Sequence, residues 1–304
     1  MSQLRLSNLF FYWVAGKARI RNIANIVYLM LKMTSLQPVM LAFAANYPDS
    51  PYRNQWARDN SLGIQYSPDP HRPDMIPERV AGFIDAGIPV RFHTRYFDFE
   101  MGHADRDLAD AALKMHMHTL ASIQGLGESV VTVHTGLRSD LPVREKHIVD
   151  NLARLVEFAD RLGIVVCLEN LRKGHAGNPF KIFEWASSAG AMLTLDLGHA
   201  LGCPMVECGL ATLPDIADLF GPRLVEVHIY GREDDDGHHP IKDIKPFEAT
   251  LGKLLETDCR WWTIELADPG QAMDTRNIIE NFFESRHVLN NDILGFYNRT
   301  TDQG

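Results

Sequence analysis

The chain has 304 residues, of which 45% are hydrophobic and 23% are charged, close to the averages of soluble globular proteins. This composition excludes a largely disordered chain and a collagen-like or coiled-coil fibre. The 39 acidic and 30 basic residues give a net charge of −9, which argues against a protein that coats phosphate backbones but leaves room for a local basic groove.

Residues 1–36 are expected to form a short basic, apolar extension outside the fold. Residues 1–48 contain basic side chains and no acidic ones. The apolar runs at 9–16 and 25–33 fall short of the roughly 18 consecutive residues that a membrane-spanning helix needs, so no transmembrane anchor is expected. A basic amphipathic surface helix is the alternative. At the other end, residues 291–304 are expected to form a tail.

Residues 37–290 repeat one pattern, in which a short apolar run is followed by an amphipathic stretch. This is the alternation of strand and helix found in parallel sheets. Helices are expected between the runs, for example at 105–127 and 144–163, and several end in a capping glycine. The eight apolar runs lie at residues 38–47, 62–68, 88–96, 129–136, 164–170, 191–199, 224–230 and 261–268.

Eight strand–helix units in roughly 250 residues predict an α/β fold, a single (β/α)8 TIM barrel at residues 37–290. A doubly wound open sheet is the alternative. That fold usually has a glycine-rich phosphate turn after its first strand, and the segment that follows residue 45 has none. The barrel is therefore the favoured fold.

The third to the eighth predicted strands each end in a side chain that commonly binds metals. The carboxyl ends of barrel strands converge on one mouth, where active sites lie. Any one such residue could be a hydrogen-bonded structural group, but carboxylates and imidazoles packed together without a cation would leave uncompensated buried charge. The pattern predicts a divalent metal site formed by His93, His134, Glu169, Asp196 with the nearby His199, His228 and Glu265.

An acidic loop follows the seventh strand at 233–240. In it, Asp236 and His238 form an Asp-x-His pair close in sequence to His228, and both are candidate metal ligands. A solvated acidic loop is the alternative interpretation.

The residues at the strand ends resemble those of the xylose-isomerase-like TIM barrels, which include sugar and sugar-phosphate isomerases and epimerases as well as endonuclease IV. The resemblance extends over roughly 230 residues, from Gly63 to the last predicted helix. Its motifs are short and distributed along the chain, so they indicate the superfamily better than a branch of it.

The resemblance to the epimerases implies one metal ion, held by Glu169, Asp196, His228 and Glu265. Glu169 and Glu265 would then be the catalytic residues that remove and return a proton next to a carbonyl, with the metal stabilising the oxygen. The substrate would be a sugar-like small molecule, contacted by His199, Arg232 and Asn170.

The resemblance to endonuclease IV implies a different centre of three zinc ions. The segment 92–103 is similar to that family's His-x-x-Tyr segment and places Tyr96 where a residue approaches DNA, which would be the partner. A hydroxide between metals would attack phosphorus, and Glu169 would bridge two ions. All nine metal ligands have candidates: His93, His134, Glu169, Asp196, His199, His228, Asp236, His238 and Glu265.

The departures from endonuclease IV favour the first interpretation. His134 is followed by Thr-Gly rather than Pro-Gly, Asp196 is followed by Leu-Gly-His rather than Thr-Cys-His, and segment 67–74 lacks the run that intrudes into DNA. The sequence thus predicts a metal-dependent sugar or sugar-phosphate isomerase or epimerase. The alternatives are an endonuclease IV-like phosphoester hydrolase with a trinuclear zinc site and a barrel that binds a ligand or metal without turnover.

The predicted metal site contains more imidazole than magnesium or calcium prefer. Zinc or manganese is therefore the expected cofactor, with one to three ions. The four cysteines form no Cys-x-x-Cys pair and are too few to staple a chain of this length, so we expect reduced thiols and a cytoplasmic location. No oligomeric state is predicted.

Overall fold

Eight parallel strands close into a barrel in the computed structural model, which describes residues 38–138 and 140–286. Each of the eight predicted apolar runs contributes one strand, so the predicted (β/α)8 fold is confirmed. Around the ring the order is β1-β10-β7-β6-β5-β4-β3-β2. The strands are β1 (Met40–Asn46), β2 (Gly63–Ser67), β3 (Val90–Thr94), β4 (Val130–Val133), β5 (Val165–Glu169), β6 (Met192–Asp196), β7 (Leu224–Ile229) and β10 (Trp261–Ile264).

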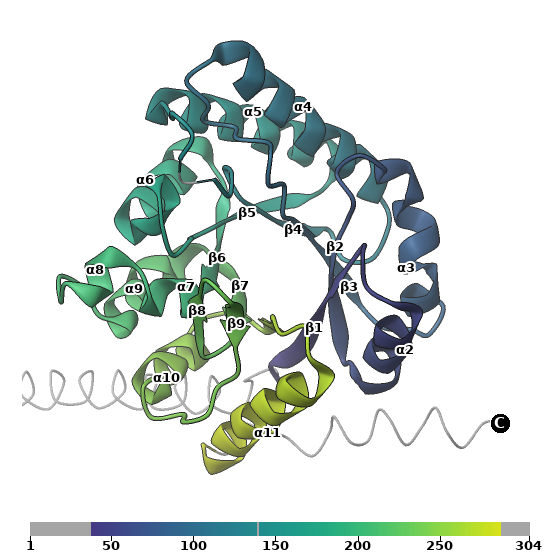
Figure 1. Ribbon diagram of the computed structural model, residues 1–304, viewed down its shortest axis with the longest axis vertical. Coiled ribbons are helices and arrows are strands. Elements are labelled where there is room, and N and C mark those ends of the chain that lie inside the picture. Colours follow the sequence, from purple (N-terminus) through teal and green to yellow (C-terminus); the bar gives the residue numbers. More distant parts are fainter. Residues whose placement is uncertain (1–37, 139, 287–304) are drawn as a thin grey trace, which may run out of the picture. The chain divides into compact units, whose positions relative to one another are not determined.

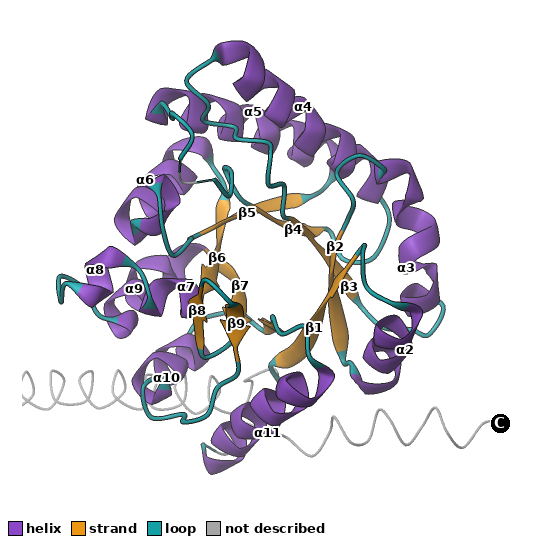
Figure 2. Ribbon diagram, in the orientation of Figure 1, coloured by secondary structure: helices purple, strands orange, loops and turns teal. Residues whose placement is uncertain are grey.

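Helices surround the ring of strands on the outside (Figures 1 and 2). The main helices are α2 (Pro51–Asn60), α3 (Ile76–Ile84), α4 (Arg106–Ile123), α5 (Glu145–Leu162), α6 (Pro179–Ala189), α9 (Leu213–Phe220), α10 (Glu248–Glu256) and α11 (Pro269–Ser285). Shorter pieces join them: α7 (Leu197–Leu201), α8 (Pro204–Glu207) and the 3₁₀ turns η1 (Pro73–Met75), η2 (His175–Gly177) and η3 (Gly221–Arg223). Among the described residues, none of these helices combines the length and the apolar character needed to cross a bilayer.

Capping residues fix where the helices begin and end. The side chains of Asp105 and Asn178 accept hydrogen bonds from backbone N–H groups in the first turns of α4 and α6. These N–H groups have no partner within the helix itself. Gly163 ends α5 with a φ of 70°, a conformation that favours glycine. These caps define where each helix begins or ends, and so where the chain leaves or returns to the barrel.

The barrel interior contains a buried polar layer beneath the mouth. In β7, alternation directs Glu226 and His228 inward and leaves Val227 facing the helices. Glu226 meets Gln65 of β2 across the interior at 2.6 Å. The outer face is apolar, as where Trp262 packs edge-on against Phe283 of α11. Polar groups are therefore gathered inside the barrel.

A small hairpin follows β7, and the sequence analysis did not predict it. Its antiparallel strands are β8 (Arg232–Asp234) and β9 (Gly237–His239), and Glu233 lies opposite His238. The hairpin packs close to α7. The predicted extension (1–36) and tail (291–304) lie outside the described residues and stay predictions.

Candidate metal centre

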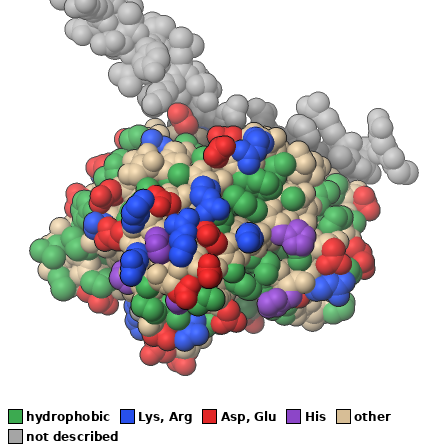
Figure 3. All heavy atoms as spheres, turned by 90° about the horizontal axis from the view of Figure 1, so that it is seen from above, with side chains coloured by type: hydrophobic (Ala, Val, Ile, Leu, Met, Phe, Trp, Pro, Cys, Tyr) green, Lys and Arg blue, Asp and Glu red, His purple; other side chains and the backbone are tan. Residues whose placement is uncertain are grey.

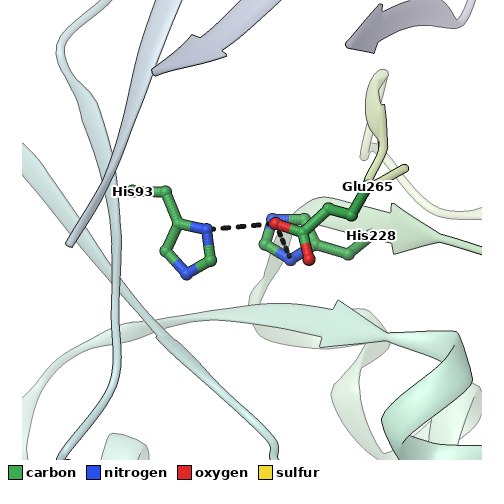
Figure 4. A group of neighbouring side chains, drawn as sticks. All are labelled: His93, His228 and Glu265. Atoms are coloured by element: carbon green, nitrogen blue, oxygen red, sulfur yellow. Dashed lines mark hydrogen bonds and ion pairs between the residues drawn. The ribbon is translucent and has the colours of Figure 1, made fainter. Parts of the chain in front are cut away.

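The carboxyl ends of six neighbouring strands bring ionisable side chains into one space. Figure 4 shows three of them, with His93 of β3 and His228 of β7 pointing towards Glu265, which follows β10. All three are buried. Eight of the nine predicted metal ligands meet here: His93, His134, Glu169, Asp196, His199, His228, His238 and Glu265.

Three atoms form a tight triangle, which we call the first cluster. His93 Nε2 lies 3.1 Å from His134 Nε2 and 2.9 Å from Glu169 Oε2, and the third edge, from His134 Nε2 to Glu169 Oε2, is 2.8 Å. An ionised carboxylate has no proton to donate, so the two nitrogens must supply every proton in the triangle. If both nitrogens carry a proton, they repel each other. If only one does, the other nitrogen and the carboxylate face each other without a proton between them. Hydrogen bonds alone therefore do not satisfy this triangle.

A divalent ion would satisfy it. Zinc ligands lie about 2.0–2.2 Å from the metal, which separates them by roughly 3.3 Å in a tetrahedron. The triangle has the size of one face of such a tetrahedron, slightly contracted. The residues of the first cluster thus fit a metal ion, and all three also line the cavity at the mouth.

The second cluster combines Glu169, Asp196, His228 and Glu265, each with one ligand atom within 4.8 Å of the others. His228 Nδ1 lies 3.1 Å from Glu169 Oε1 and 3.6 Å from Glu265 Oε1. Asp196 Oδ2 is buried and has no hydrogen-bond partner among the described residues. A buried polar atom usually has a partner, and a bound cation would provide one here. This is the ligand set that the sequence predicts for a single metal.

Glu169 belongs to both clusters. Its Oε2 contacts His93 and His134, whereas its Oε1 contacts His228. One carboxylate therefore presents its two oxygens to two separate sets of imidazoles. Glu169 could therefore take part in holding an ion at either cluster.

The third cluster consists of His199, Glu233 and His238. The Nδ1 atoms of both histidines lie 2.9 Å from backbone carbonyls, those of Asn170 and Glu265. A carbonyl only accepts, so each Nδ1 donates and each Nε2 keeps a free lone pair for a ligand. His199 Nε2 lies 3.5 Å from Glu233 Oε2.

Tyr230 and Gly198 support this third cluster. The Tyr230 ring stacks on His238 at 3.8 Å and 5°. A Cβ atom at position 198 would lie 2.0 Å from the Tyr230 ring. The glycine in the Asp-Leu-Gly-His turn is therefore needed for Tyr230 to approach the backbone and align His238.

Burial and mutual charges shift the pKa values of the clustered groups. Burial favours the neutral form of Glu169, but the charges of His228, His134 and His93 outweigh it and hold its pKa well below the usual range. Burial, and then the charges of Glu169 and Glu265, raise the pKa of Asp196 well above it. Burial lowers the pKa of His134 to about 4. A bound divalent ion would favour the unprotonated ligands throughout.

Asp236 is the one predicted ligand that lies outside the clusters. In the hairpin, residues 235 and 236 form the turn, and the register places Glu233 directly opposite His238 on one face. Asp236 is therefore exposed at the tip, and Glu233, not Asp236, lies in the third cluster. The Asp-Gly pair at 236–237 is typical of a two-residue turn, but a turn at those two residues would shift the register by one, so this signal does not select Glu233.

The predicted substrate contacts Arg232, Tyr96 and Asn170 do not line the cavity at the mouth. Arg232 is mostly exposed and pairs with Asp234 at 3.3 Å. Tyr96 is buried beside α4, where its hydroxyl bonds with Thr119. The Asn170 side chain donates to the carbonyl of Asp196 and accepts from its N–H, so it ties β5 to β6. His199, the fourth, does line the cavity.

A cavity of about 270 Å³ opens onto the first and third clusters. Its wall includes three cations that the sequence analysis missed, Arg95, Arg172 and Lys173. Arg172 and Lys173 pair with acidic side chains of the hairpin, whereas Arg95 is exposed and forms no ion pair within the described residues. Leu137, Leu171 and the largely exposed Phe97 supply an apolar wall.

Comparisons with known proteins agree with the fold. A family model described as a xylose isomerase-like TIM barrel matches residues 55–285. An uncharacterized protein of Methanocaldococcus jannaschii is 28% identical over 158 residues, which cover 52% of this chain and 68% of that protein.

Two solved structures illustrate the range of similar proteins. The 3-keto-D-glucoside 4-epimerase of E. coli has a TM-score of 0.59 and 17% identity, covering 80% of this chain and 98% of its own. Endonuclease IV from Thermus thermophilus has a TM-score of 0.60 and 14% identity, covering 81% and 99%. Likeness at this level of identity shows the fold.

Proposed function

The chain belongs to the xylose isomerase-like TIM barrel family, and we propose that it hydrolyses phosphoester bonds of a small phosphorylated substrate at a centre of two or three divalent metal ions. The observation that carries this proposal is the triangle of His93, His134 and Glu169. It supports a metal position in addition to the second cluster, and a single-metal epimerase does not require one.

The cations of the cavity wall support an anionic substrate. Arg95, Arg172 and Lys173 lie on the same cavity as the metal-type ligands. A guanidinium or ammonium group binds phosphate oxygens through charge-assisted hydrogen bonds. Arg95 has no acidic partner among the described residues, so no ion pair has to break for it to bind a phosphate.

The surface supports a small substrate rather than duplex DNA. Acidic and basic side chains are mixed on the side of the barrel that Figure 3 shows. At the mouth, Arg172 and Lys173 are paired with acidic side chains of the hairpin, whereas a surface that follows a phosphate backbone is strongly basic. The net charge of −9 points the same way. A cavity of about 270 Å³ suits a phosphorylated metabolite of modest size.

Divalent ions bound at the clusters would stabilise negative charge on phosphate oxygens as Lewis acids and lower the pKa of a water molecule. The chain itself orients the groups: Glu169 holds the two clusters at a fixed separation, and Arg95 and Lys173 hold phosphate oxygens that face the mouth. Phe97, Leu137 and Leu171 cover part of the cavity and strengthen its electrostatic interactions by excluding water. In the net reaction, water adds to phosphorus and the ester bond to the alcohol breaks.

The second candidate function is the sugar isomerase or epimerase, which Glu265 favours. Glu265 lines the cavity, and its Oε2 lies 3.8 Å from His238 Nδ1, beyond hydrogen-bond distance. A carboxylate oxygen free in this way could transfer a proton. An epimerase needs a second group that returns the proton. Glu169 is less suited to this task, because its Oε2 contacts two imidazoles.

The experiment is a paired activity assay on protein loaded with zinc or manganese. One arm uses p-nitrophenyl phosphate and bis(p-nitrophenyl) phosphate, and the other follows epimerisation of a panel of ketoses and their phosphates. His134→Gln is the test variant, and His118→Gln, exposed on α4, is the matched control.

We expect hydrolysis that His134→Gln abolishes and His118→Gln preserves. Epimerisation that survives His134→Gln, without hydrolysis, would instead establish the second candidate. Metal binding without either turnover would leave the barrel as a binding protein.

A further inference from the structure

A carboxylate is buried in the barrel interior beneath the second cluster. Glu226 of β7 is fully buried and accepts hydrogen bonds from Gln65 Nε2 at 2.6 Å and Thr263 Oγ1 at 2.7 Å. Its countercharge is Arg91, whose Nη1 lies 3.7 Å from Glu226 Oε2. Burying such a pair usually stabilises a fold less than apolar packing of the same volume would. Stability alone therefore does not account for a carboxylate at this position.

Glu226 faces the far side of a metal-type ligand. His228 turns Nδ1 towards Glu169 and the second cluster, and its other nitrogen, Nε2, lies 3.6 Å from Glu226 Oε1. Gln65 lies between them, with Nε2 at 2.7 Å from His228 Nε2. Gln65, Glu226 and His228 are each fully buried, so no solvent competes for these contacts.

The chemistry of imidazole ligation explains the arrangement. A histidine that binds a metal through Nδ1 carries its proton on Nε2, and this proton needs an acceptor. Two acceptors are within reach, Glu226 Oε1 and the amide oxygen of Gln65 after rotation of its amide. Gln65 Oε1 is buried and has no partner among the described residues.

We propose that Glu226 and Gln65 form a positioning pair that holds His228 with Nδ1 towards the metal and accepts the proton of its Nε2. The inference rests on the proposed function in that it takes His228 as a metal ligand. It adds two residues that touch neither metal nor substrate, and it assigns the buried polar layer of the barrel a role in metal affinity.

Arg91, the countercharge of Glu226, also contacts other groups. Its guanidinium lies over the Trp261 ring at 4.4 Å and also bonds with the carbonyl of Val225 and with Glu128. Arg91 thus has other partners if Glu226 loses its charge. For this reason Glu226→Gln removes a buried charge without leaving an unpaired cation.

The test measures zinc affinity and metal-free stability in the same variants. Glu226→Gln and Gln65→Met nearly conserve side-chain volume, and Thr194→Val is the matched control, because Thr194 lies in the same interior layer and bonds with Thr132 instead of His228. We expect the two test variants to weaken zinc binding about 10- to 100-fold, the usual effect of losing a partner of a ligating histidine. Thr194→Val should retain the zinc affinity of the parent chain.

The melting temperature separates positioning from a structural role. Glu226→Gln should change the metal-free melting temperature little, since Arg91 keeps Glu128 and the Val225 carbonyl as partners and the amide oxygen can still accept hydrogen bonds. A zinc affinity equal to that of the parent chain in Glu226→Gln would overturn the proposal. So would a lowered affinity that is matched by the Thr194→Val control.

A double-mutant cycle shows whether the pair acts through His228. In a His228→Ala background, Glu226→Gln should have no further effect on zinc affinity, and a full additional loss would overturn the proposal. If Glu226→Gln does not fold, Gln65→Met carries the same cycle. The readout uses no substrate, so failure of the proposed hydrolysis would leave these results distinct, whereas a parent chain that binds no zinc would overturn both proposals.

Discussion

The strand-end residues and the β8–β9 hairpin both supply metal-type ligands, but they are built differently. Glu169 and Asp196 end neighbouring strands of a closed sheet and are fully buried, so backbone register fixes their positions. Glu233 and His238 sit on a two-strand hairpin and are half-buried. The closed sheet therefore positions the first two clusters, whereas two of the three residues of the third cluster depend on the hairpin.

Strand-end residues and hairpin residues should therefore differ in how well they tolerate substitution. Displacing a strand-end ligand disturbs a site that several elements share, and the loss should be large. Displacing a hairpin ligand should affect one cluster only. The predictions below follow that order.

The largest effect is expected for Glu169→Gln. The amide cannot present two anionic oxygens to two sets of imidazoles, so both the first and the second clusters weaken. We expect phosphoester hydrolysis to fall by at least about 100-fold, exceeding the loss caused by a residue outside the ligand set. A steady-state assay of the zinc-loaded variant measures this loss. Near-normal activity would show that hydrolysis does not depend on Glu169 as a ligand shared by the two clusters.

An intermediate effect is expected for Glu233→Gln. Loss of the third cluster should weaken one metal position and lower kcat about 10-fold or more, while the other positions stay filled. Asp236→Asn is the matched control on the same hairpin and should change metal content and kcat less than about twofold. The reverse result would restore Asp236 as the ligand that the sequence predicts.

The smallest effect on activity is expected for Arg95→Gln. If Arg95 holds a phosphate oxygen equally in the ground and transition states, KM rises about 10-fold, equivalent to roughly 1.4 kcal/mol, and kcat stays nearly constant. Arg232→Gln, which removes an exposed arginine paired with Asp234, should leave both constants unchanged. Michaelis–Menten analysis with p-nitrophenyl phosphate distinguishes the two, and equal effects would argue against a specific anion contact.

The sequence predicts the barrel, and it predicts that the strand-end side chains gather at one mouth, for a physical reason. Parallel strands in a barrel end at one mouth, so residues such as His134 and Glu265 converge whatever the loops do. His199 lies near the same mouth because it follows Asp196 by one helical turn, and the Asp196 side chain caps α7.

The cavity wall and the hairpin were harder to predict from sequence. Within an acidic run, Asp236 and Glu233 are equally plausible metal ligands until the position of the turn is known. A change of register by one residue moves each side chain to the opposite face of its strand. Arg95 and Arg172 lie in loops, whose paths depend on packing that periodicity does not encode. The role of Tyr96 as a DNA contact stays a prediction, although the structure buries its side chain beside α4.

The number of metal ions per chain distinguishes a multinuclear centre from a single-metal site. Elemental analysis of protein purified without chelators should be compared with the same analysis of His134→Gln. The account predicts two or three ions in the parent chain and one fewer in the variant, because His134 belongs to the first cluster alone. A content near one ion that His134→Gln leaves unchanged would contradict the account and favour a single-metal isomerase.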